Sequence, residues 1–418
     1  MPAAAGTLLM LAAACSSSDK ASPAGTSVKA PDAATTITPA NGAAKVRPDK
    51  GVTVTADSGV LEQVSVQAGK SSVDGVLSAD KKSWTTKWTL SPGTAYTVTA
   101  TAKNAAGQVT TVTSKFTTLK ASSTIKISDV TPNAGETVGV GMPITVTFDG
   151  PVSNKAAVEK ALEVRSTSPM EGAWRWITSE QAIFRTKEYW PAYSKVSLVA
   201  HLAGVRAASG VYGVKDVTKN FSIGASHIAK VNLKTHKSNV YVDGRLAKTI
   251  PVSGGTGGSD SHGNDFRTTS GIHLAMGKSP VVTMTSPNIK PNEAGYYHEV
   301  VYKDVQISNS GEYLHQSPGE YGCLGHSNCS HGCVRQTPSG AKWFYNLSNR
   351  GDVIIISGTS RDLEWNNGWG YWQLSFTKWM KESALKQPVT TTPLTAAPGA
   401  GAPAQNPGAG TGTAPAPN

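Results

Sequence analysis

An internal repeat constrains the fold of this chain more than any other feature of its sequence. The segment TPANGAAKVRPDKGVTVTADSG (38–59) is echoed by TPNAGETVGVGMPITVTFDGP (131–151), so a Thr-Pro step, glycines and a strand-like run recur together. Each copy ends in a second strand-like segment with one phenylalanine, Phe116 or Phe221. Alternation of apolar and polar residues along such segments is typical of strands with one buried and one solvated face.

We predict from this repeat two tandem β-sandwiches of the Ig-like type, over residues 37–122 and 123–224. The segment TAYTVTATAKNAAGQVTTVTSKF shows the alternation on both sides of an expected hairpin turn at 104–107. Because 418 residues are too many for one ordinary core, further globular units are expected. Tryptophans of the two sandwiches are expected to pack inside them rather than to form a glycan-binding face. These are Trp84, Trp88, Trp174 and Trp176.

A third β-rich unit with one or two short helices is predicted over residues 225–358, which makes the whole chain mainly β. Its clearest hairpin is 238–255, where apolar residues alternate around an Asp243-Gly244 turn. One helix is expected after Thr337, a fair N-cap, and before Asn349, since proline follows the cap at the first helical position. Further strand-like runs lie at 281–286, 296–308 and 352–358.

The composition changes twice after this unit. Residues 359–386 are rich in tryptophan and predict a C-terminal subdomain, a loop followed by a short amphipathic helix whose aromatic side chains pack against the domain. Residues 387–418 are mostly Pro, Ala, Gly and Thr, and such a composition cannot bury a core. A disordered tail is therefore expected there.

The first residues predict an extracytoplasmic protein. GTLLMLAAAC (6–15) is a short apolar run that is too brief to span a bilayer, and Leu11 to Cys15 resembles a bacterial lipobox. We therefore expect residues 1–15 to be a lipoprotein signal peptide and Cys15 to carry the lipid. Residues 16–36 are Ser, Ala, Pro, Thr and Lys and suit a flexible tether. The protein is expected to be anchored in the outer leaflet of the cell membrane, facing the cell wall.

The charge balance gives a weaker indication about partners. A net charge of +11 favours anionic surfaces such as cell-wall polymers or lipid head groups. No combination of basic and aromatic residues typical of nucleic-acid binding is found, so no nucleic acid is expected as a partner.

A cluster of cysteines and histidines near the end of the third unit carries the chemistry. A structural zinc site is one interpretation, but the spacing C-x5-C-x3-C lacks the paired short knuckles that preorganise zinc, so no metal is predicted. The cluster consists of His315, Cys323, His326, Cys329, His331 and Cys333.

A disulfide is a second interpretation, and an oxidising compartment permits it. If Cys15 carries lipid, three cysteines remain and one of them must stay free. Cys323 and Cys329 enclose a short loop of Leu, Gly, His, Ser and Asn, whereas Cys333 belongs to a His-Gly-Cys turn. We predict a Cys323–Cys329 bridge and a free Cys333.

A nucleophile is the third interpretation, for Cys333. A thiol with the ordinary pKa of about 8.5 is mostly protonated at neutral pH, and a nearby imidazole lowers that pKa. His315 and His331 are both candidates for this role. Gly332 lets backbone N–H groups face a developing oxyanion, each worth roughly 3 kcal/mol of transition-state stabilisation, and Arg335 is a candidate for binding a substrate carboxylate.

The segments YLHQS (313–317) and SHGCVR (330–335), with fourteen residues between His315 and Ser330, resemble the signature of the L,D-transpeptidase catalytic domain of the YkuD type. YVDGRLAKTIPVSGG and TTSGIHLAMG resemble further segments of that family. The arrangement of lipobox, two Ig-like modules, catalytic domain and Trp-rich extension is similar to the L,D-transpeptidase lipoproteins of actinobacteria.

The resemblance implies that Cys333 is the nucleophile, that His315 is its general base or ion-pair partner, and that the amides of Gly332 and Cys333 form an oxyanion hole. Family members attack the carbonyl after the L-centre of diaminopimelate in a donor tetrapeptide stem, release D-Ala and transfer the acyl group to an acceptor stem, giving a 3→3 cross-link. Carbapenem β-lactams acylate the same cysteine, and no cofactor is implied. The residues implied to orient the substrate are Ser330, His331 and Arg335.

Two other functions fit parts of the sequence. A sortase-like cysteine transpeptidase also orders histidine before cysteine on a β scaffold, but sortases separate the two more widely and lack His-Gly before the cysteine. A non-catalytic cell-wall-binding protein would use the Ig-like repeats as its working part.

Overall fold

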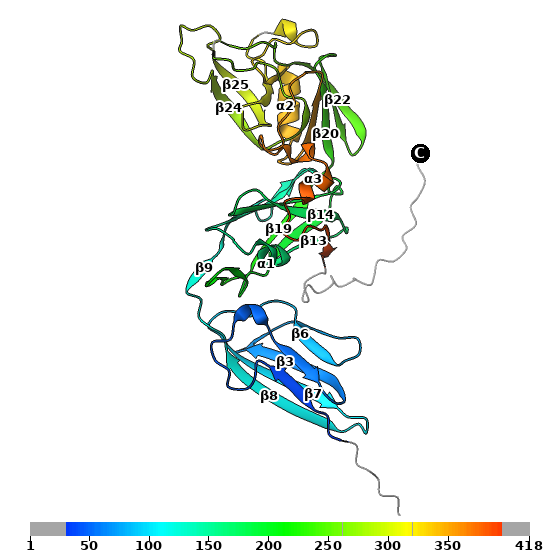
Figure 1. Cartoon of the computed structure of the whole chain (residues 1–418). Coiled ribbons are helices and arrows are strands. Elements are labelled where there is room, and N and C mark those ends of the chain that lie inside the picture. Colours follow the sequence, from blue (N-terminus) through cyan, green and yellow to red (C-terminus); the bar gives the residue numbers. More distant parts are fainter. Residues whose placement is uncertain (1–30, 261, 320, 395–418) are drawn as a thin grey trace, which may run out of the picture.

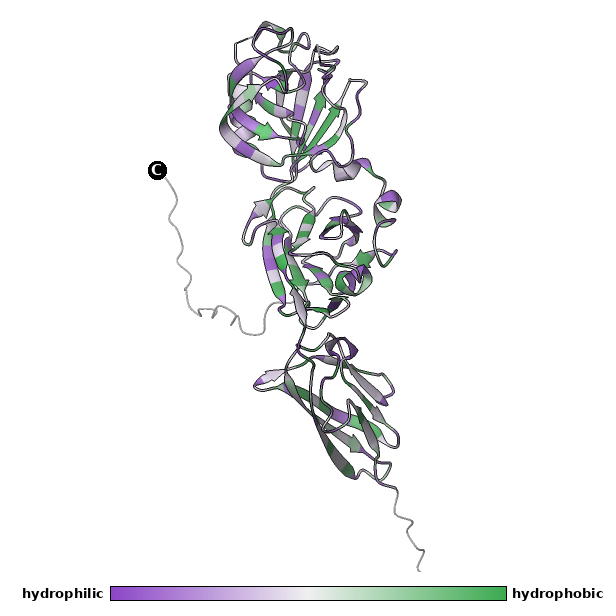
Figure 2. Ribbon diagram, turned by 60° about the vertical axis from the view of Figure 1, so that its left-hand side comes forward, coloured by the Kyte–Doolittle hydropathy of each residue, from purple (hydrophilic) through white to green (hydrophobic). Residues whose placement is uncertain are grey.

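Three β-rich units follow one another along an elongated molecule in the computed structural model, which describes residues 31–260, 262–319 and 321–394 (Figure 1). The first unit is at the bottom of the view, the second lies in the middle, and the third is at the top. Apolar segments run along the strands within each unit, next to polar ones (Figure 2). The predicted mainly β fold is confirmed.

Two four-stranded sheets form the first unit, with the orders β1-β2-β6-β5 and β4-β3-β7-β8. Burial alternates strictly along β7, whose inward residues include Tyr96 and Val98, as the sequence pattern predicted. The first strand begins at Thr35 and Ala33 is 4% exposed within the core, so the predicted linker ends earlier than residue 36. The strands are β1 (Thr35–Thr38), β2 (Thr53–Ala56), β3 (Val60–Ala68), β4 (Ser71–Ser72), β5 (Gly75–Leu77), β6 (Ser83–Thr86), β7 (Ala95–Lys103) and β8 (Val109–Thr117), with a 3₁₀ turn at Pro48–Lys50.

The second unit has two five-stranded sheets, β10-β12-β15-β14-β29 and β11-β19-β16-β13-β30, and a small sheet β17-β18-β9. A short helix, α1 (Lys155–Lys160), was not predicted. The strands are β9 (Ser123–Ile125), β10 (Ile127–Thr131), β11 (Thr137–Val138), β12 (Ile144–Phe148), β13 (Leu162–Ser166), β14 (Glu171–Trp176), β15 (Gln181–Thr186), β16 (Lys195–Ala200), β17 (Arg206–Ala208), β18 (Val211–Gly213), β19 (Val217–Ile223), β29 (Val389–Thr390) and β30 (Thr392–Pro393).

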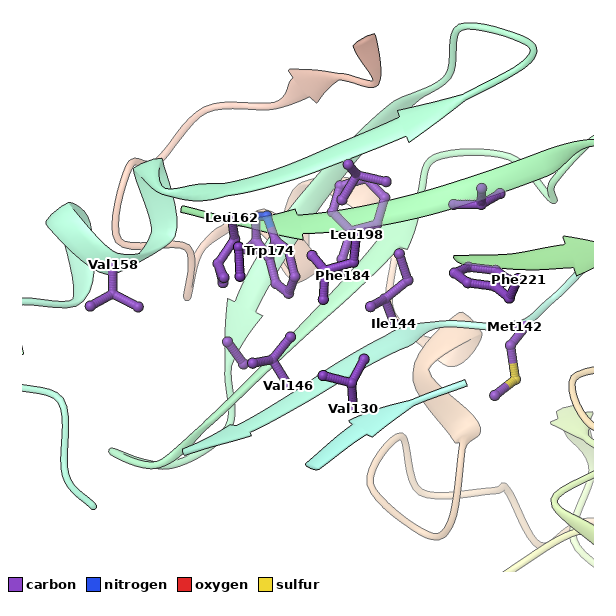
Figure 3. Packing of buried hydrophobic residues seen from close by; sticks show 14 of the residues in the cluster. Val130, Met142, Ile144, Val146, Val158, Leu162, Trp174, Phe184, Leu198 and Phe221 are labelled. Atoms are coloured by element: carbon purple, nitrogen blue, oxygen red, sulfur yellow. The ribbon is translucent and has the colours of Figure 1, made fainter. Parts of the chain in front are cut away.

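The core between these sheets is aromatic and aliphatic. Trp174 and Phe184 lie beside Leu198 in the centre of the unit (Figure 3). Trp84, Trp174 and Trp176 are buried, as expected for packing tryptophans. Trp88 is half-buried and stacks on His201 of the second unit, with ring centroids 3.7 Å apart.

The third unit is built on one nine-stranded sheet of order β23-β28-β20-β21-β22-β27-β26-β25-β24. The predicted hairpin is β21–β22, and both Asp243 and Gly244 have the positive φ that its tight turn requires. The strands are β20 (His227–Asn232), β21 (Lys237–Val242), β22 (Arg245–Ser253), β23 (Gly271–Leu274), β24 (Gly277–Thr285), β25 (His298–Gln306), β26 (Tyr313–Gln316), β27 (Val334–Gln336) and β28 (Val353–Ser357), with a 3₁₀ turn at Tyr321–Cys323.

The predicted helix is α2 (Pro338–Leu347). Thr337 caps it, because its side chain accepts a hydrogen bond from the Gly340 N–H. Phe344 is 3% exposed and packs with Val305, Leu314 and Val334 in the core of the unit. The helix thereby packs against one face of the strands that flank the His-Gly-Cys segment.

The Trp-rich segment packs mainly on the second unit. A 3₁₀ turn (Gly370–Gln373) leads to α3 (Phe376–Met380), the predicted short helix. Trp379 is fully buried, and its Nε1 donates to the Ala173 carbonyl at 2.9 Å. The sequence did not predict that this segment would cross from the third unit to the sandwich before it.

The predicted disordered tail is wrong for its first residues. β29 pairs with β14 and β30 pairs with β13, so residues 389–393 extend both sheets of the second unit. Thr391 between them is 2% exposed, and its Oγ1 lies 2.7 Å from Ser166 Oγ. Threonine and valine favour strands, and this short run precedes the Ala/Gly/Pro-rich part, residues 395–418, which lies outside the described residues.

The predicted signal peptide, the lipidated Cys15 and most of the tether also lie outside the described residues. Within the ranges that the structure covers, none of the helices combines the length and apolar character needed to cross a bilayer.

Candidate active site

Two parallel strands bring the predicted histidine and cysteine together. In the pairing of β26 with β27, Leu314 faces Val334 and His315 faces Arg335. Leu314 and Val334 are both fully buried in the core, so alternation turns the neighbouring side chains to the opposite face. Cys333, directly before β27, shares that opposite face with His315. Both line one cavity.

The cavity is small, about 190 Å³. Pockets for small molecules are typically 300–1,000 Å³, so this one is smaller than a typical ligand pocket. Met284 of β24 contributes to its wall, with Sδ 3.9 Å from Cys333 Sγ, and the Gly311 carbonyl oxygen lies 3.6 Å from the same sulfur. The β24–β25 hairpin therefore borders the nucleophile.

His315 is a neutral base in this site. Its Nδ1 donates to the Gln316 carbonyl at 2.7 Å, which fixes the tautomer and leaves the Nε2 lone pair to accept a proton. Burial, together with a smaller contribution from the positive charge of Arg335, lowers the pKa of His315 to about 4. The imidazole is therefore unprotonated at neutral pH, as a general base requires.

Cys333 is a neutral thiol in the same state. Burial raises its pKa to about 12; the charges of Glu312 and Asp304 also raise it, whereas the Tyr313 backbone N–H and Arg335 lower it. The expectation that a nearby imidazole lowers the pKa of this thiol is not met in the resting site. The reason is desolvation, which penalises a charged sulfur more than its neighbours stabilise it.

Side-chain hydroxyls hold the turn around the nucleophile. Ser330 Oγ donates to the Cys333 carbonyl at 2.6 Å and accepts from the Gly332 N–H at 3.1 Å. Thr268 Oγ1 accepts from the Gly255 N–H at 2.9 Å and donates to the Gly332 carbonyl at 2.7 Å. Ser330, expected to orient substrate, thus orients the turn itself.

These bonds change the predicted oxyanion hole. The Gly332 N–H is already used by Ser330, so it is not a free donor in this structure. Because the C=O and N–H of one peptide point in opposite directions, the bond from Thr268 to the Gly332 carbonyl turns the Cys333 N–H away from Thr268. Of the two expected donors, the Cys333 amide is the one left for an oxyanion.

His331 lies between two aromatic rings. It stacks on Tyr297, with centroids 4.4 Å apart, and meets the edge of Phe266 at 4.9 Å. Its ring thus forms part of the cavity wall together with Tyr297. Of the two histidines that the sequence offered as bases, His315 has the fixed tautomer and the strand position beside Cys333.

Arg335 is not exposed to a ligand. Its side chain is 2% exposed, and its Nη2 donates to both carboxylate oxygens of Glu299, at 3.1 and 3.2 Å. Its Nη1 donates to the Cys329 carbonyl at 3.3 Å. The predicted role of binding a substrate carboxylate is therefore taken by a protein carboxylate in this structure.

Cys323 and Cys329 are free thiols, so the predicted bridge is not formed in this structure. The two are neighbours nonetheless: burial raises the pKa of Cys329, and a hydrogen bond with Cys323 raises it further. Cys329 Sγ also lies 3.2 Å from Ser253 Oγ. His326 is exposed on the turn between the two cysteines. Among the described residues no three His, Cys, Asp or Glu side chains are grouped as metal ligands.

Sequence reasoning missed several residues of the site. Thr268 sits in the RTTSG segment, and Glu299 and Asp304 lie on β25, where polar residues look like an ordinary solvated strand face. Glu312 precedes the YLHQ segment and is 4% exposed. Thr268 begins the recognised TTSGIHLAMG segment and Glu312 directly precedes YLHQS, so these two positions gave a signal. Glu299 and Asp304 lie in neither motif and meet the site through tertiary pairing.

Comparison with known proteins agrees with this geometry. The bacterial Ig domain family matches residues 43–206, and the L,D-transpeptidase catalytic domain family matches residues 226–356. L,D-transpeptidase 5 of Mycobacterium tuberculosis (strain H37Rv) is 32% identical, covering 81% of this chain and 74% of the relative. L,D-transpeptidase 2 of the same species (strain CDC 1551) is 32% identical, covering 80% and 81%. The chain belongs to the L,D-transpeptidase family, a family of transferases.

Solved structures with similar chains carry the same family name. LdtMt1 in complex with imipenem shares 27% identity at a TM-score of 0.47, over 55% of this chain and 98% of that chain. L,D-transpeptidase 3 of M. tuberculosis with a faropenem-derived adduct shares 26% identity at a TM-score of 0.45, over 55% and 97%.

Proposed function

We propose that this protein is a peptidoglycan L,D-transpeptidase that forms 3→3 cross-links through an acyl-enzyme on Cys333 and releases D-Ala from a tetrapeptide donor stem. The observation that carries the proposal is the pair of parallel strands that presents Cys333 and a neutral, tautomer-fixed His315 to one cavity. A base beside a thiol, with an amide donor for the oxyanion, is what acyl transfer requires.

The reaction begins with concerted activation, because both groups are neutral at rest. As Cys333 Sγ attacks the carbonyl carbon of the donor stem, its proton moves to His315 Nε2 and the Cys333 N–H donates to the oxyanion. Collapse of the tetrahedral intermediate breaks the bond to D-Ala, whose amine takes the proton from His315. A thioester on Cys333 remains.

The second half-reaction reverses these roles. The side-chain amine of an acceptor stem attacks the thioester, loses a proton to His315, and expels the Cys333 sulfur, which recovers a proton. The new amide is the cross-link, and the number of protons and bonds balances over the cycle. No step in this sequence calls on a metal or an organic cofactor.

Carbapenems are proposed as covalent inhibitors of the same site. A β-lactam carbonyl attacked by Cys333 opens its ring, and no leaving group departs, so the adduct has the full mass of the drug. L,D-transpeptidases that carry the same family name have been solved in complex with imipenem and with a faropenem-derived adduct.

The location proposed is the outer face of the cell membrane. A lipid on Cys15 would anchor the chain, and the following residues would act as a tether. The net charge of +11 suits a protein that works beside anionic wall polymers.

A bridge between Cys323 and Cys329 is proposed for the protein in that oxidising location. It would close a small ring, so it would rigidify the loop before Cys333 more than it stabilises the fold. Mass spectrometry of the unreduced protein tests for the bridge. Free thiols at Cys323, Cys329 and Cys333 would refute it.

Replacing the nucleophile tests the central proposal. Cys333→Ala is expected to abolish D-Ala release, dimer formation and carbapenem mass addition, whereas the control Ser327→Ala, at an exposed position of the preceding turn, keeps all three. Unchanged activity of Cys333→Ala would remove this residue from the mechanism. Acyl transfer only from a sorting-type peptide would favour the sortase-like alternative, and wall binding without D-Ala release would favour the binding protein.

A further inference from the structure

Arg335 and Glu299 form an ion pair whose partners have unequal access to the cavity. The Arg335 side chain is 2% exposed, and that of Glu299 is 28% exposed. Arg335 is committed to protein acceptors, through Nη2 to both Glu299 oxygens and through Nη1 to the Cys329 carbonyl. The member of the pair that a ligand meets is therefore the carboxylate.

The β24–β25 hairpin places Glu299 beside the nucleophile. Glu299 pairs across the hairpin with Met284, whose Sδ lies 3.9 Å from Cys333 Sγ. Glu299, Met284 and Cys333 all line the same cavity. A group held by Glu299 is thus held in the space where the stem peptide reacts.

The other carboxylates of the cavity are buried or bonded to neighbours in their own loop, whereas Glu299 is held by Arg335 from a different strand, β27. Glu312 is 4% exposed and accepts from the N–H and the hydroxyl of Thr269, at 2.7 and 2.6 Å. Asp265 is paired with Arg267 at 2.7 Å. Asp260 accepts from its own loop.

The charges of the lining favour a cationic ligand. Its four carboxylates outnumber its two guanidiniums, and they still outnumber three when Arg267, the partner of Asp265, is included, so an ammonium is attracted and a second carboxylate is repelled. The carboxylates are Asp260, Asp265, Glu299 and Glu312, and the guanidiniums are Arg335 and Arg361.

We propose that Glu299 is a specificity-determining residue that binds the side-chain ammonium of the diamino acid in a peptidoglycan stem. The inference rests on the proposed function, because it concerns the substrate of the same cavity. Two stems carry such an amine, the donor and the acceptor. A hydrogen bond between charged groups contributes about 1.5 kcal/mol, which corresponds to about tenfold in binding.

The first arm of the test concerns the donor. D-Ala release is measured with a tetrapeptide stem that has a free side-chain amine and with the same stem acetylated on that amine. If Glu299 binds the donor, the kcat/KM of the wild type is about tenfold higher for the free-amine stem than for the acetylated stem. Glu299→Gln is expected to abolish this advantage, mainly through KM.

The second arm concerns the acceptor. With the acetylated stem as donor, the concentration of a tripeptide acceptor is varied. The fractions of the acyl-enzyme that undergo aminolysis and hydrolysis are measured at each concentration. If Glu299 binds the acceptor, Glu299→Gln raises the acceptor concentration for half-maximal aminolysis about tenfold. Hydrolysis of the acyl-enzyme stays unchanged, which a merely structural defect would not leave intact.

A matched control removes the same charge nearby. Glu293→Gln lies in the loop that joins β24 to β25, outside the cavity lining, and is expected to behave as the wild type in both arms. The proposal is overturned if Glu299→Gln equals the wild type in both arms while D-Ala is still released.

Failure of the proposed function gives a different result. If the wild type releases no D-Ala from either stem, the reaction assignment is wrong. Calorimetric binding of the two stems to Cys333→Ala, with and without Glu299→Gln, then tests the role of Glu299 in binding independently of the reaction. Tighter binding of the free-amine stem that Glu299→Gln removes supports the inference. Equal affinity of that protein for the free and acetylated stems overturns it.

Discussion

The ionisation of two residues decides how this site starts its reaction. Burial holds His315 unprotonated and Cys333 protonated, so the pair at rest is neutral rather than ionic. In the proposed reaction, the donor stem must therefore reach the sulfur before charge develops, and charge then develops on an oxyanion that the Cys333 amide can bind. A neutral resting thiol also reacts slowly with small electrophiles, because the thiolate is the nucleophilic form.

The pH dependence of acylation tests this ionisation. The base is lost when His315 is protonated, so the acylation rate is expected to hold from pH 7 down to about 5 and to fall by half near its pKa of about 4. Carbapenem mass addition per unit time measures it. An acid limb near 6.5, the ordinary pKa of histidine, would contradict the buried neutral base.

Asp304 is a further buried ionisable group of the third unit. It is fully buried, and neither carboxylate oxygen has a hydrogen-bond partner within the described part of the chain. Burial raises its pKa to about 7. Since the folded-state pKa exceeds the unfolded one of about 3.9, the native state binds more protons between these values, and stability falls as the pH rises through this window.

Asp304→Asn should remove that pH dependence. The variant is expected to be more stable than the wild type by about 1–3 kcal/mol at pH 8, where the wild type buries a charge, and nearly equal to it at pH 5. Denaturant unfolding at both pH values measures the difference. A difference in unfolding free energy between variant and wild type that is the same at pH 5 and pH 8 would mean that the carboxylate is not charged in the native state.

At the scale of elements, the chain could be predicted where a local pattern fixes the outcome. The β21–β22 hairpin follows from Asp243-Gly244, and α2 follows from Thr337 and its proline. The relation of His315 to Cys333 followed from the motif. Glu299 could not be placed, because it depends on the pairing of β24 with β25 and on the approach of β27 from a distant part of the sequence.

A hydrogen bond between two loops, from Thr268 to Gly332, holds the turn that carries Cys333. Thr268→Val removes the hydroxyl that holds the Gly332 carbonyl, and we expect kcat to fall by about 10- to 100-fold because the Cys333 amide is no longer aimed. Thr268→Ser keeps the hydroxyl and should retain most of the activity. Measured kcat and unfolding curves separate the effects, and lost stability with unchanged kcat would show a structural role alone.

At the scale of the whole molecule, the second sandwich and the catalytic unit share one core. Leu274 and Val353 of the catalytic unit pack within the hydrophobic cluster of the sandwich, and Arg350 pairs with Glu136 at 3.2 Å. Residues 389–393 return to complete both sheets of that sandwich. Sequence alone could not show this return, because a two-residue strand has no periodicity and its partners lie more than 200 residues earlier.

Truncation measures the contribution of these terminal strands. A chain that stops after Gln387 loses β29, β30 and the buried Thr391, and its free energy of unfolding is expected to fall by about 1–3 kcal/mol. A chain that stops after Leu394 removes only residues outside the described set and serves as the control. Equal thermal midpoints of the two truncated chains would contradict the role of the strands.

The formation of a thioester on Cys333 is tested most directly by the mass of the intact protein, quenched during turnover of a defined tetrapeptide stem. The account predicts a transient increase equal to the stem without its D-Ala, mapped by proteolysis to the peptide that contains Cys333, and absent from Cys333→Ala. Release of D-Ala with no adduct at any quench time in the wild type, or an adduct that persists in Cys333→Ala, would contradict it.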